Sequence, residues 1–241
     1  MKHSLLALII LVLPASAEKI TTIKVATESW ERATHKDGTG WYFDIVRKIY
    51  KPRGITMQHQ IVPYTRSVML VKTGKADLWL GSYEDEEKEA LYPRTAYDLD
   101  IVVALFKNEK VKEWKGEVSI TGKKVGWIKD YAYDQYLHVK VVSKEIYDRK
   151  IALRVLAAGR IDFFVDEIRL VNDAIKKHNF DKTGYGMENL LRLKLLPGFS
   201  NNARGKALRS IWEERMKEMH ANGELKAFYK KNGVLRKYPF E

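Results

Sequence analysis

The sequence predicts an α/β protein built from two similar lobes, and three observations lead to this prediction. Strand-like and helix-like segments alternate along the chain, which favours a mainly parallel sheet with helices on its faces. The layout "GKADLWLGS" at 74–82 returns as "GRIDFFVDE" at 159–167, each time after a helix-like segment. The C-terminal segment is strongly helical. Because ligands of open α/β sheets bind beyond the carboxyl ends of the strands, we expect a shared cleft between the lobes.

The first unit has the predicted order strand, helix, strand, helix, strand. Its first strand is rich in β-branched residues, and its first helix carries apolar residues at helical spacing before it stops at Pro52 and Gly54. In this order each helix crosses from one parallel strand to the next. The predicted elements are a strand at 20–29, a helix at 41–54, a strand at 56–63, a helix at 65–74 and a strand at 76–82.

The same order restarts after a further predicted strand at 100–109. Gly74 and Gly159 each follow a predicted helix, at the place where a left-handed backbone favours glycine, so we interpret both as helix C-terminal caps. The repeated layout is therefore the helix-to-strand step of two similar units. The second unit is predicted as a strand at 122–130, a helix at 131–139, a strand at 140–144, a helix at 147–159 and a strand at 161–167.

The tail from Arg204 to Gly233 is predicted as a long helix and a second short helix, divided by Gly223. One side of the long helix is apolar and is expected to pack on a lobe. The residues spaced to pack there are Leu208, Ile211, Trp212, Met216 and Met219.

The first 17 residues have the pattern of a secretory signal peptide. Basic Lys2 precedes the apolar run "LLALIILVL" at 5–13, and small residues lead up to Ala17. The run is too short to anchor the chain in a bilayer. We expect cleavage after Ala17, no lipid anchor because the chain has no cysteine, and a soluble monomer in the periplasm.

Charge and composition exclude several functional classes. The formal net charge is +12, but 43 basic and 31 acidic residues are interspersed without a dense basic tract, so no nucleic-acid partner is expected. The six histidines lack metal-ligand spacing, and neither a phosphate-binding loop nor an esterase elbow is present. We therefore expect no metal, no cofactor and no enzymatic activity.

Four segments resemble the extracellular solute-binding proteins of family 3, the amino-acid-type periplasmic components of ABC importers. The segments are "GWYFDIVRKIY" at 40–50, "PYTRSVMLVKTGKAD" at 63–77, "VLAAGRIDFFVDE" at 155–167 and the helical tail at 202–231. The resemblance implies a type II, Venus-flytrap fold that closes on a small-molecule ligand and is recognised by a membrane permease. It implies one lobe formed by 18–106 plus 197–241 and a second lobe formed by 107–196.

The resemblance also implies where a ligand's charged groups are bound. Glu167 stands at the position of the family's ammonium-binding aspartate; alternation along the strand turns Asp166 to the opposite face, and we favour Glu167. The small-residue turn at Ser82 leads to Lys88, which stands where the family has a carboxylate-binding arginine. Because lysine lacks the bidentate fork, Arg66 is an alternative clamp.

Further candidates come from the start of one helix and from the aromatic residues. Tyr64 precedes Arg66 at a predicted helix start, where backbone amides can receive an anion. Trp30 and Tyr83 follow predicted strands and are expected to stack on a ligand or its cation, and Trp127 belongs to the same predicted rim.

The sequence supports three hypotheses about function. The first is a periplasmic binding protein that delivers a polar amino acid or related small zwitterion to an ABC permease. The second is an enzyme on the same fold, similar to cyclohexadienyl dehydratase, with Glu167 as general acid or base. The third is a module that senses a ligand for a membrane receptor.

Overall fold

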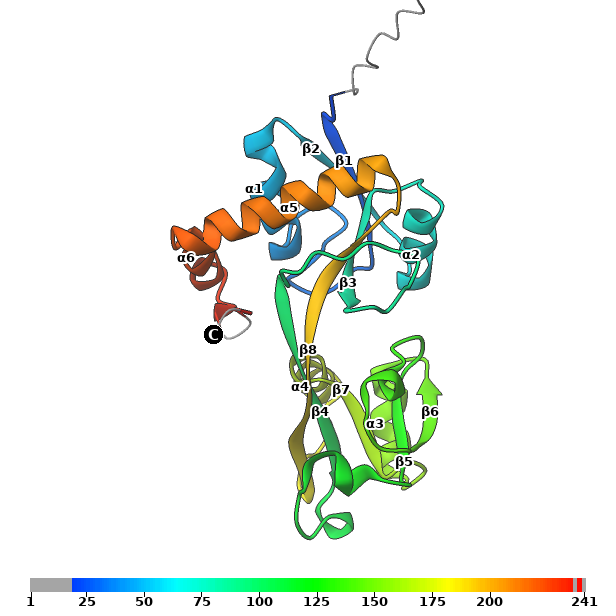
Figure 1. Ribbon diagram of the computed structural model, residues 1–241. Coiled ribbons are helices and arrows are strands. Elements are labelled where there is room, and N and C mark those ends of the chain that lie inside the picture. Colours follow the sequence, from blue (N-terminus) through cyan, green and yellow to red (C-terminus); the bar gives the residue numbers. More distant parts are fainter. Residues whose placement is uncertain (1–18, 236–237, 240–241) are drawn as a thin grey trace, which may run out of the picture.

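The computed structural model describes residues 19–235 and 238–239, so the predicted signal peptide at 1–17 lies outside the described residues. The chain forms two lobes, and the long strands β4 (Asp98–Lys107) and β8 (Tyr185–Phe199) run from one lobe into the other (Figure 1). The two-lobed α/β fold predicted from the sequence is therefore confirmed. No helix within the described residues is long and apolar enough to cross a membrane.

The strands form one sheet in the order β2-β1-β3-β8-β4-β7-β5-β6. Strands pair in parallel within each unit, as the alternation of strands and helices predicts, whereas β4 and β8 pair antiparallel at the centre. The first unit contains β1 (Thr22–Thr27), β2 (Thr56–Ile61) and β3 (Leu78–Tyr83). The second contains β5 (Lys124–Ile128), β6 (Val142–Ile146) and β7 (Phe163–Glu167).

A narrow neck joins the two lobes. On the first-lobe side β8 pairs with β3 through Leu195, Leu196, Gly198 and Phe199. On the second-lobe side β4 pairs with β7 from Val102 onward. Within the described part of the chain, residues 99–101 of β4 and 192–194 of β8 pair with each other and with no other strand. The predicted lobe boundaries near 106–107 and 196–197 stay a prediction.

Helices cover the sheet in both lobes. The first lobe has α1 (Trp41–Tyr50) and α2 (Tyr64–Lys72), and the second has α3 (Arg149–Ala157) and α4 (Ile168–Lys177). After β8 the chain returns to the first lobe, where α5 (Ala203–Ala221) lies across it and α6 (Glu224–Lys231) follows (Figure 1). Short 3-10 turns are found at Lys51–Arg53, Asn108–Lys110, Gly116–Ile120 and Tyr133–Tyr136.

The repeated layout forms the same local structure in both lobes. Gly74 and Gly159 have φ angles of +70° and +67°, so the predicted left-handed positions after α2 and α3 are confirmed. The aspartate that follows ties its strand to the first strand of the unit: Asp77 accepts the Lys24 N–H at 2.7 Å, and Asp162 accepts the Lys124 N–H at 3.0 Å. Each aspartate thus fixes where a new strand enters the sheet.

The tail completes the core of the first lobe. Gly223 has a φ angle of +78° and separates α5 from α6, as predicted. Four of the five predicted packing residues of α5 are fully buried, and Ile211 is partly buried against the same cluster. The fully buried residues are Leu208, Trp212, Met216 and Met219.

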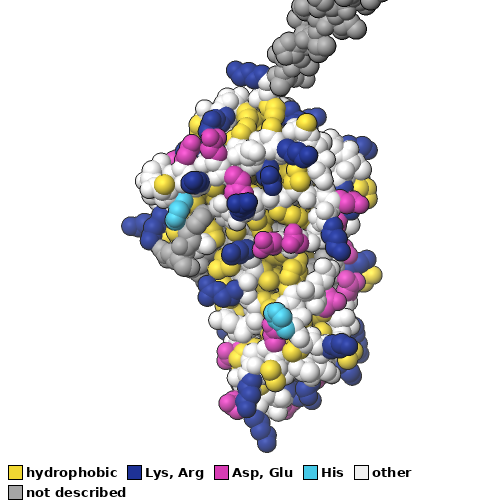
Figure 2. All heavy atoms as spheres, in the orientation of Figure 1, with side chains coloured by type: hydrophobic (Ala, Val, Ile, Leu, Met, Phe, Trp, Pro, Cys, Tyr) yellow, Lys and Arg dark blue, Asp and Glu magenta, His cyan; other side chains and the backbone are white. Residues whose placement is uncertain are grey.

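The predicted helix at 131–139 is wrong, because the segment forms only the 3-10 turn Tyr133–Tyr136. Asp130 and Ala132 have positive φ angles, which interrupts any helix at its start, and the buried Tyr133 side chain fixes the turn against the core of the second lobe. On the face shown in Figure 2, basic side chains are scattered among acidic ones over both lobes.

Candidate functional site

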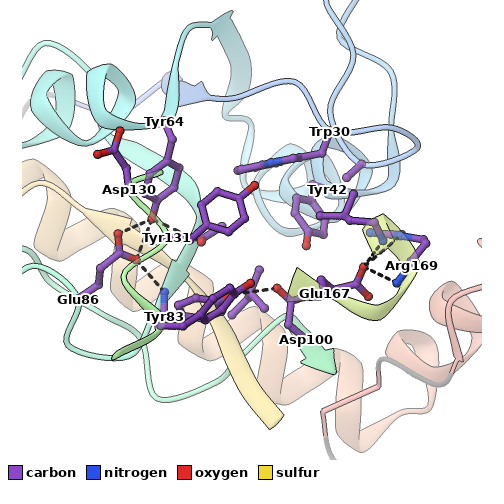
Figure 3. A pocket seen from close by; sticks show the side chains of 15 residues that line it. Trp30, Tyr42, Tyr64, Tyr83, Glu86, Asp100, Asp130, Tyr131, Glu167 and Arg169 are labelled. Carbon is purple, nitrogen blue, oxygen red and sulfur yellow. Dashed lines mark hydrogen bonds and ion pairs between the residues drawn. The ribbon is translucent and has the colours of Figure 1, made fainter. Parts of the chain in front are cut away.

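A cavity of about 70 Å³ lies between the lobes, near the carboxyl ends of β1, β3 and β7 (Figure 3). A wider groove of about 770 Å³ continues from it and shares Trp30, Tyr64, Asp130, Tyr131 and Leu170. Both lobes contribute to the cavity wall, so a ligand there would contact both. The lining residues are Trp30, Ala33, Tyr42, Tyr64, Gly81, Tyr83, Glu86, Asp100, Asp130, Tyr131, Tyr133, Glu167, Arg169, Leu170 and Leu195.

The indole of Trp30 covers the end of β3. Its ring centroid lies 6.1 Å from that of Tyr42 and 6.3 Å from that of Tyr64. Gly81 has a φ angle of +86°, and a Cβ atom there would lie 2.5 Å from the Trp30 ring. Glycine is therefore required at this position both by the backbone and by the close approach of the indole.

Glu86 is the centre of a hydrogen-bond cluster on the first-lobe wall (Figure 3). Its carboxylate accepts the Tyr64 hydroxyl at 2.7 and 2.8 Å, the Ser82 hydroxyl at 3.0 Å and the Tyr83 N–H at 3.1 Å. Burial raises the pKa of Glu86 above its ordinary value, although these donors oppose the rise. Sequence reasoning missed Glu86, because nothing in the run "EDEE" distinguishes one carboxylate from the next.

The two acidic residues that end β7 have different environments. Asp166 is fully buried and pairs with Arg149, whose Nε lies 2.8 Å from Oδ2; it does not line the cavity. Glu167 lines the cavity and caps α4, accepting the N–H groups of Arg169 at 2.9 Å and Leu170 at 3.1 Å. The structure therefore turns Glu167 to the cavity, and its contact with a ligand stays a prediction.

Arg149 and Tyr131 lie beside this pair. The Arg149 guanidinium donates to the Tyr131 hydroxyl at 3.2 Å, and both residues line the wider groove. Burial raises the pKa of Tyr131 to about 12, with Arg149 opposing the shift. Burial also raises the pKa of Glu28, which lines the groove from the first lobe and is attracted by Arg149.

The lobes contact each other around the cavity. The Thr65 hydroxyl donates to Asp130 of the other lobe at 3.3 Å. The Tyr83 ring lies 5.1 Å from the ring of Tyr136 and 6.4 Å from that of Tyr133, centroid to centroid. These contacts partly enclose the cavity, which is the arrangement expected when the lobes are closed.

The structure brings only some of the predicted site residues together. Trp30, Tyr64, Tyr83 and Glu167 line the cavity, and Ser82 is buried against Glu86.

The remaining candidates lie elsewhere. Arg66 is exposed on α2, Lys88 is exposed in the loop after β3, and neither lines the cavity. Trp127 is buried in the core of the second lobe, because its side chain on β5 points into that core and not toward the cavity. Sequence reasoning also missed Arg169, which lines the cavity from the first turn of α4, a helix that was not predicted.

Among the described residues, no group of three or more histidine or acidic side chains is placed to hold a metal ion.

No family model and no curated protein matches the chain. Solved structures do match it. The substrate-binding protein of an amino acid ABC transporter is 16% identical, with coverage of 87% of this chain and 98% of that one and a TM-score of 0.62. A histidine kinase sensor domain with similarity to periplasmic binding proteins is 16% identical, with coverage of 89% and 97% and a TM-score of 0.68.

A third match is an ancestral amino acid-binding protein described as a precursor of cyclohexadienyl dehydratase. It is 16% identical and has a TM-score of 0.63, with coverage of 88% of this chain and 94% of that one. Identities this low establish the architecture rather than the ligand. The chain therefore has the two-lobed α/β fold of the amino-acid-binding proteins that serve ABC transporters.

Proposed function

We propose that the protein binds a polar amino acid or a related small zwitterion between its lobes and delivers it to the permease of an ABC importer. The observation that carries this proposal is the cavity itself. Both lobes line it with aromatic rings and charged groups, and it lies at the carboxyl ends of parallel strands, where such folds bind ligands.

The wall supplies groups for each part of such a ligand. An ammonium group placed near Glu167 gains a charge-assisted hydrogen bond, and the Trp30 and Tyr64 rings cover its apolar part. Arg169 offers a guanidinium to a carboxylate. Because these groups come from different lobes, a bound ligand holds the lobes together, and the permease would recognise the closed form.

This function requires export. We propose that residues 1–17 direct the chain to the periplasm and are removed after Ala17. Mass spectrometry of the protein recovered from a periplasmic extract should give a chain that starts at Glu18.

A second candidate function is ligand sensing, supported by the match to a histidine kinase sensor domain. The two functions share the cavity and differ in the membrane protein that contacts the lobes. Crosslinking of the closed protein to membranes from its own cells would identify that protein as a permease or a kinase. Turnover of arogenate or prephenate would instead support the dehydratase hypothesis.

A thermal-shift screen tests the binding function. The protein is unfolded and refolded to remove bound ligand and is then heated with amino acids, amines, small carboxylates and peptides. A ligand at a thousand times its dissociation constant adds about 4 kcal/mol to stability. For a chain of this size the melting temperature should rise by about 8–16 °C. No shift with any compound would contradict the proposal.

A further inference from the structure

We propose that the first lobe contains a carboxylate-binding site and that the protein's own Glu86 occupies it where a ligand carboxylate would otherwise bind. The inference rests on the proposed binding function and deepens it, because it adds a first-lobe site for a carboxylate to the guanidinium that Arg169 offers on the second lobe. Its basis is the set of donors around Glu86, their place on the cavity wall and the loop that carries Glu86.

Three donors converge on the Glu86 carboxylate. The hydroxyls of Tyr64 and Ser82 and the backbone N–H of Tyr83 lie 2.7 to 3.1 Å from its oxygens. Tyr64 begins α2, whereas Ser82 and Tyr83 end β3, so the helix and the strand fix the positions of the donors. Because a carboxylate only accepts hydrogen bonds, three donors directed at one point form a site that suits any carboxylate of similar size.

Other side chains hold these donors in place. The Trp79 indole N–H donates to the Tyr64 hydroxyl at 3.2 Å, which leaves the hydroxyl hydrogen directed away from Trp79. The Ser82 side chain is fully buried, and its Oγ lies 3.2 Å from the Tyr92 hydroxyl. The donors would therefore keep much the same positions if a different carboxylate replaced that of Glu86, and a preorganised site binds its ligand at a lower entropic cost.

The site opens onto the cavity between the lobes. Tyr64, Tyr83 and Glu86 line this cavity of about 70 Å³, and Figure 3 shows the Glu86 carboxylate among its donors. The indole of Trp30, whose centroid lies 6.3 Å from that of the Tyr64 ring, lines the adjoining wall. A ligand in the cavity therefore lies beside the Glu86 carboxylate, and its own carboxylate gains the three donors only by displacing that of Glu86.

Glu86 lies on the loop after β3, so its carboxylate can leave the site while α2 and β3 stay in place. Asp85, just before it, has a φ angle of +57°, a left-handed conformation that most residues other than glycine adopt only at a cost in energy. Glu87, just after it, pairs with Lys72 at 2.8 Å and anchors the following part of the loop. Burial also raises the pKa of Glu86, so return of the charged carboxylate to water would recover hydration. The exchange replaces one carboxylate by another and leaves the charge at the donors unchanged.

Acetate tests the site in Glu86→Ala, because acetate has the carbon and the carboxylate that this substitution removes. At pH 7, acetate should raise the melting temperature of Glu86→Ala by about 2–4 °C over sodium chloride of the same concentration, with a saturating dependence. The wild type, in which Glu86 fills the site, and Glu84→Ala, which changes an exposed residue of the same loop outside the cavity, should show no such rise. Acetamide should have no effect, and the added substitution Tyr64→Phe, which removes one donor, should reduce the response of Glu86→Ala to acetate.

Calorimetry with amino acids measures the competition with Glu86 directly. Each amino acid that shifts the wild-type melting temperature is compared with its α-amide, which has no α-carboxylate. Glu86→Ala and Glu86→Gln should bind the amino acid about tenfold or more tightly than the wild type does, because an absent or uncharged side chain is displaced more easily from the donors. Both variants should bind the α-amide with little change. Glu86→Gln keeps an acceptor oxygen for the donors and decides the result if Glu86→Ala does not fold.

Two results would overturn the inference. One is a response of Glu86→Ala to acetate that is no larger than that of the wild type. The other is an affinity of Glu86→Gln for the amino acid that stays within about twofold of the wild type or falls, as expected if Glu86 only holds the loop or binds the ligand itself. Either result leaves the binding function intact as long as an amino acid binds the wild type. If no amino acid binds while acetate stabilises Glu86→Ala, the binding function fails and the carboxylate site stands.

Discussion

The two copies of the repeated layout share a scaffold and differ in what they present to the cavity. Each begins with a left-handed glycine after a helix and ties its aspartate to the first strand of its unit. Beyond that point they diverge. β3 ends at Tyr83 and leads into a loop that carries Glu86, whereas β7 ends in Asp166 and Glu167 and leads directly into α4.

The difference teaches that the repeat specifies the entry of a strand into the sheet and leaves its end free to vary. On the first-lobe wall, hydroxyls and a backbone amide hold Glu86. In the second lobe, Arg149 pairs with the buried Asp166, and Arg169 lies near Glu167. Uncharged donors therefore hold Glu86 in one lobe, whereas arginine side chains lie beside the two acids that end β7 in the other.

The largest expected effect comes from breaking the buried pair of the second lobe. Arg149→Met leaves Asp166 charged and fully buried, and removal of one partner of such a pair typically costs about 3–5 kcal/mol. The melting temperature should fall by about 6–20 °C. Arg154→Met, on the exposed side of the same helix, is the control and should change it little. Equal melting temperatures for the two variants would show that the pair contributes nothing.

The paired aspartates should differ in their contribution to stability. Asp77 accepts the Lys24 N–H and also pairs with Arg204 at 2.7 Å. Asp162 accepts the Lys124 N–H but pairs with no arginine among the described residues. Hydrogen bonds to charged groups contribute about 1.5–3 kcal/mol each. Asp77→Ala should therefore destabilise more than Asp162→Ala in urea unfolding. A larger loss from Asp162→Ala would contradict this explanation of the repeat.

The paired glycines, in contrast, should behave alike. Their φ angles are +70° and +67°, and a Cβ atom at either position would meet nothing closer than 3.8 Å. Only backbone strain then opposes alanine, at about 1 kcal/mol. Gly74→Ala and Gly159→Ala should lower stability equally in chemical denaturation. Gly81→Ala gives the contrast, because the Trp30 ring would have to move and ligand binding should also weaken.

The smallest expected effect is a change in pH dependence. Burial raises the pKa of Glu86 above 4.5, so the folded protein holds this proton more tightly than the unfolded chain does. The contribution of Glu86 to stability is therefore most favourable below pH 4.5 and is lost as the pH rises through the raised pKa.

Between pH 4 and pH 7, the free energy of unfolding of the wild type should accordingly decrease relative to that of Glu86→Gln as the pH rises. A difference that moves in favour of the wild type over this range would mean that the hydrogen bonds to Glu86 outweigh its burial. Glu84→Gln controls for the change in net charge of the loop.

Local patterns predicted most of the scaffold. Helical spacing, glycine caps and the repeated layout are short-range signals. The first unit formed as expected from them, and the second did so except at 131–139, where a 3-10 turn replaces the predicted helix. β8 was missed because "ENLLRLK" at 188–194 alternates poorly, and the sheet accommodates it with a register shift between Val102 and Val103 of β4. α4 was missed because Glu167 was considered only as a ligand contact, although it also caps that helix.

The site was predicted less completely, because it depends on contacts between distant segments. Trp30 follows a strand, and Tyr83 and Glu167 each end one, so all three could be placed at the rim from topology alone. Glu86 faces the cavity because Tyr64, 22 residues away, donates to it, and no local pattern reports that contact. Lys88 was matched to the family's carboxylate-binding arginine by its distance from the turn at Ser82, but its side chain is exposed to solvent.

The neck between the lobes has a mechanical consequence. Two hydrogen-bonded strands, 99–101 and 192–194, form a thin ribbon that bends out of its plane more easily than it shears within it. Bending of this ribbon changes the angle between the two lobes. A membrane partner that touches both lobes could read occupancy from that angle alone, without any contact with the ligand.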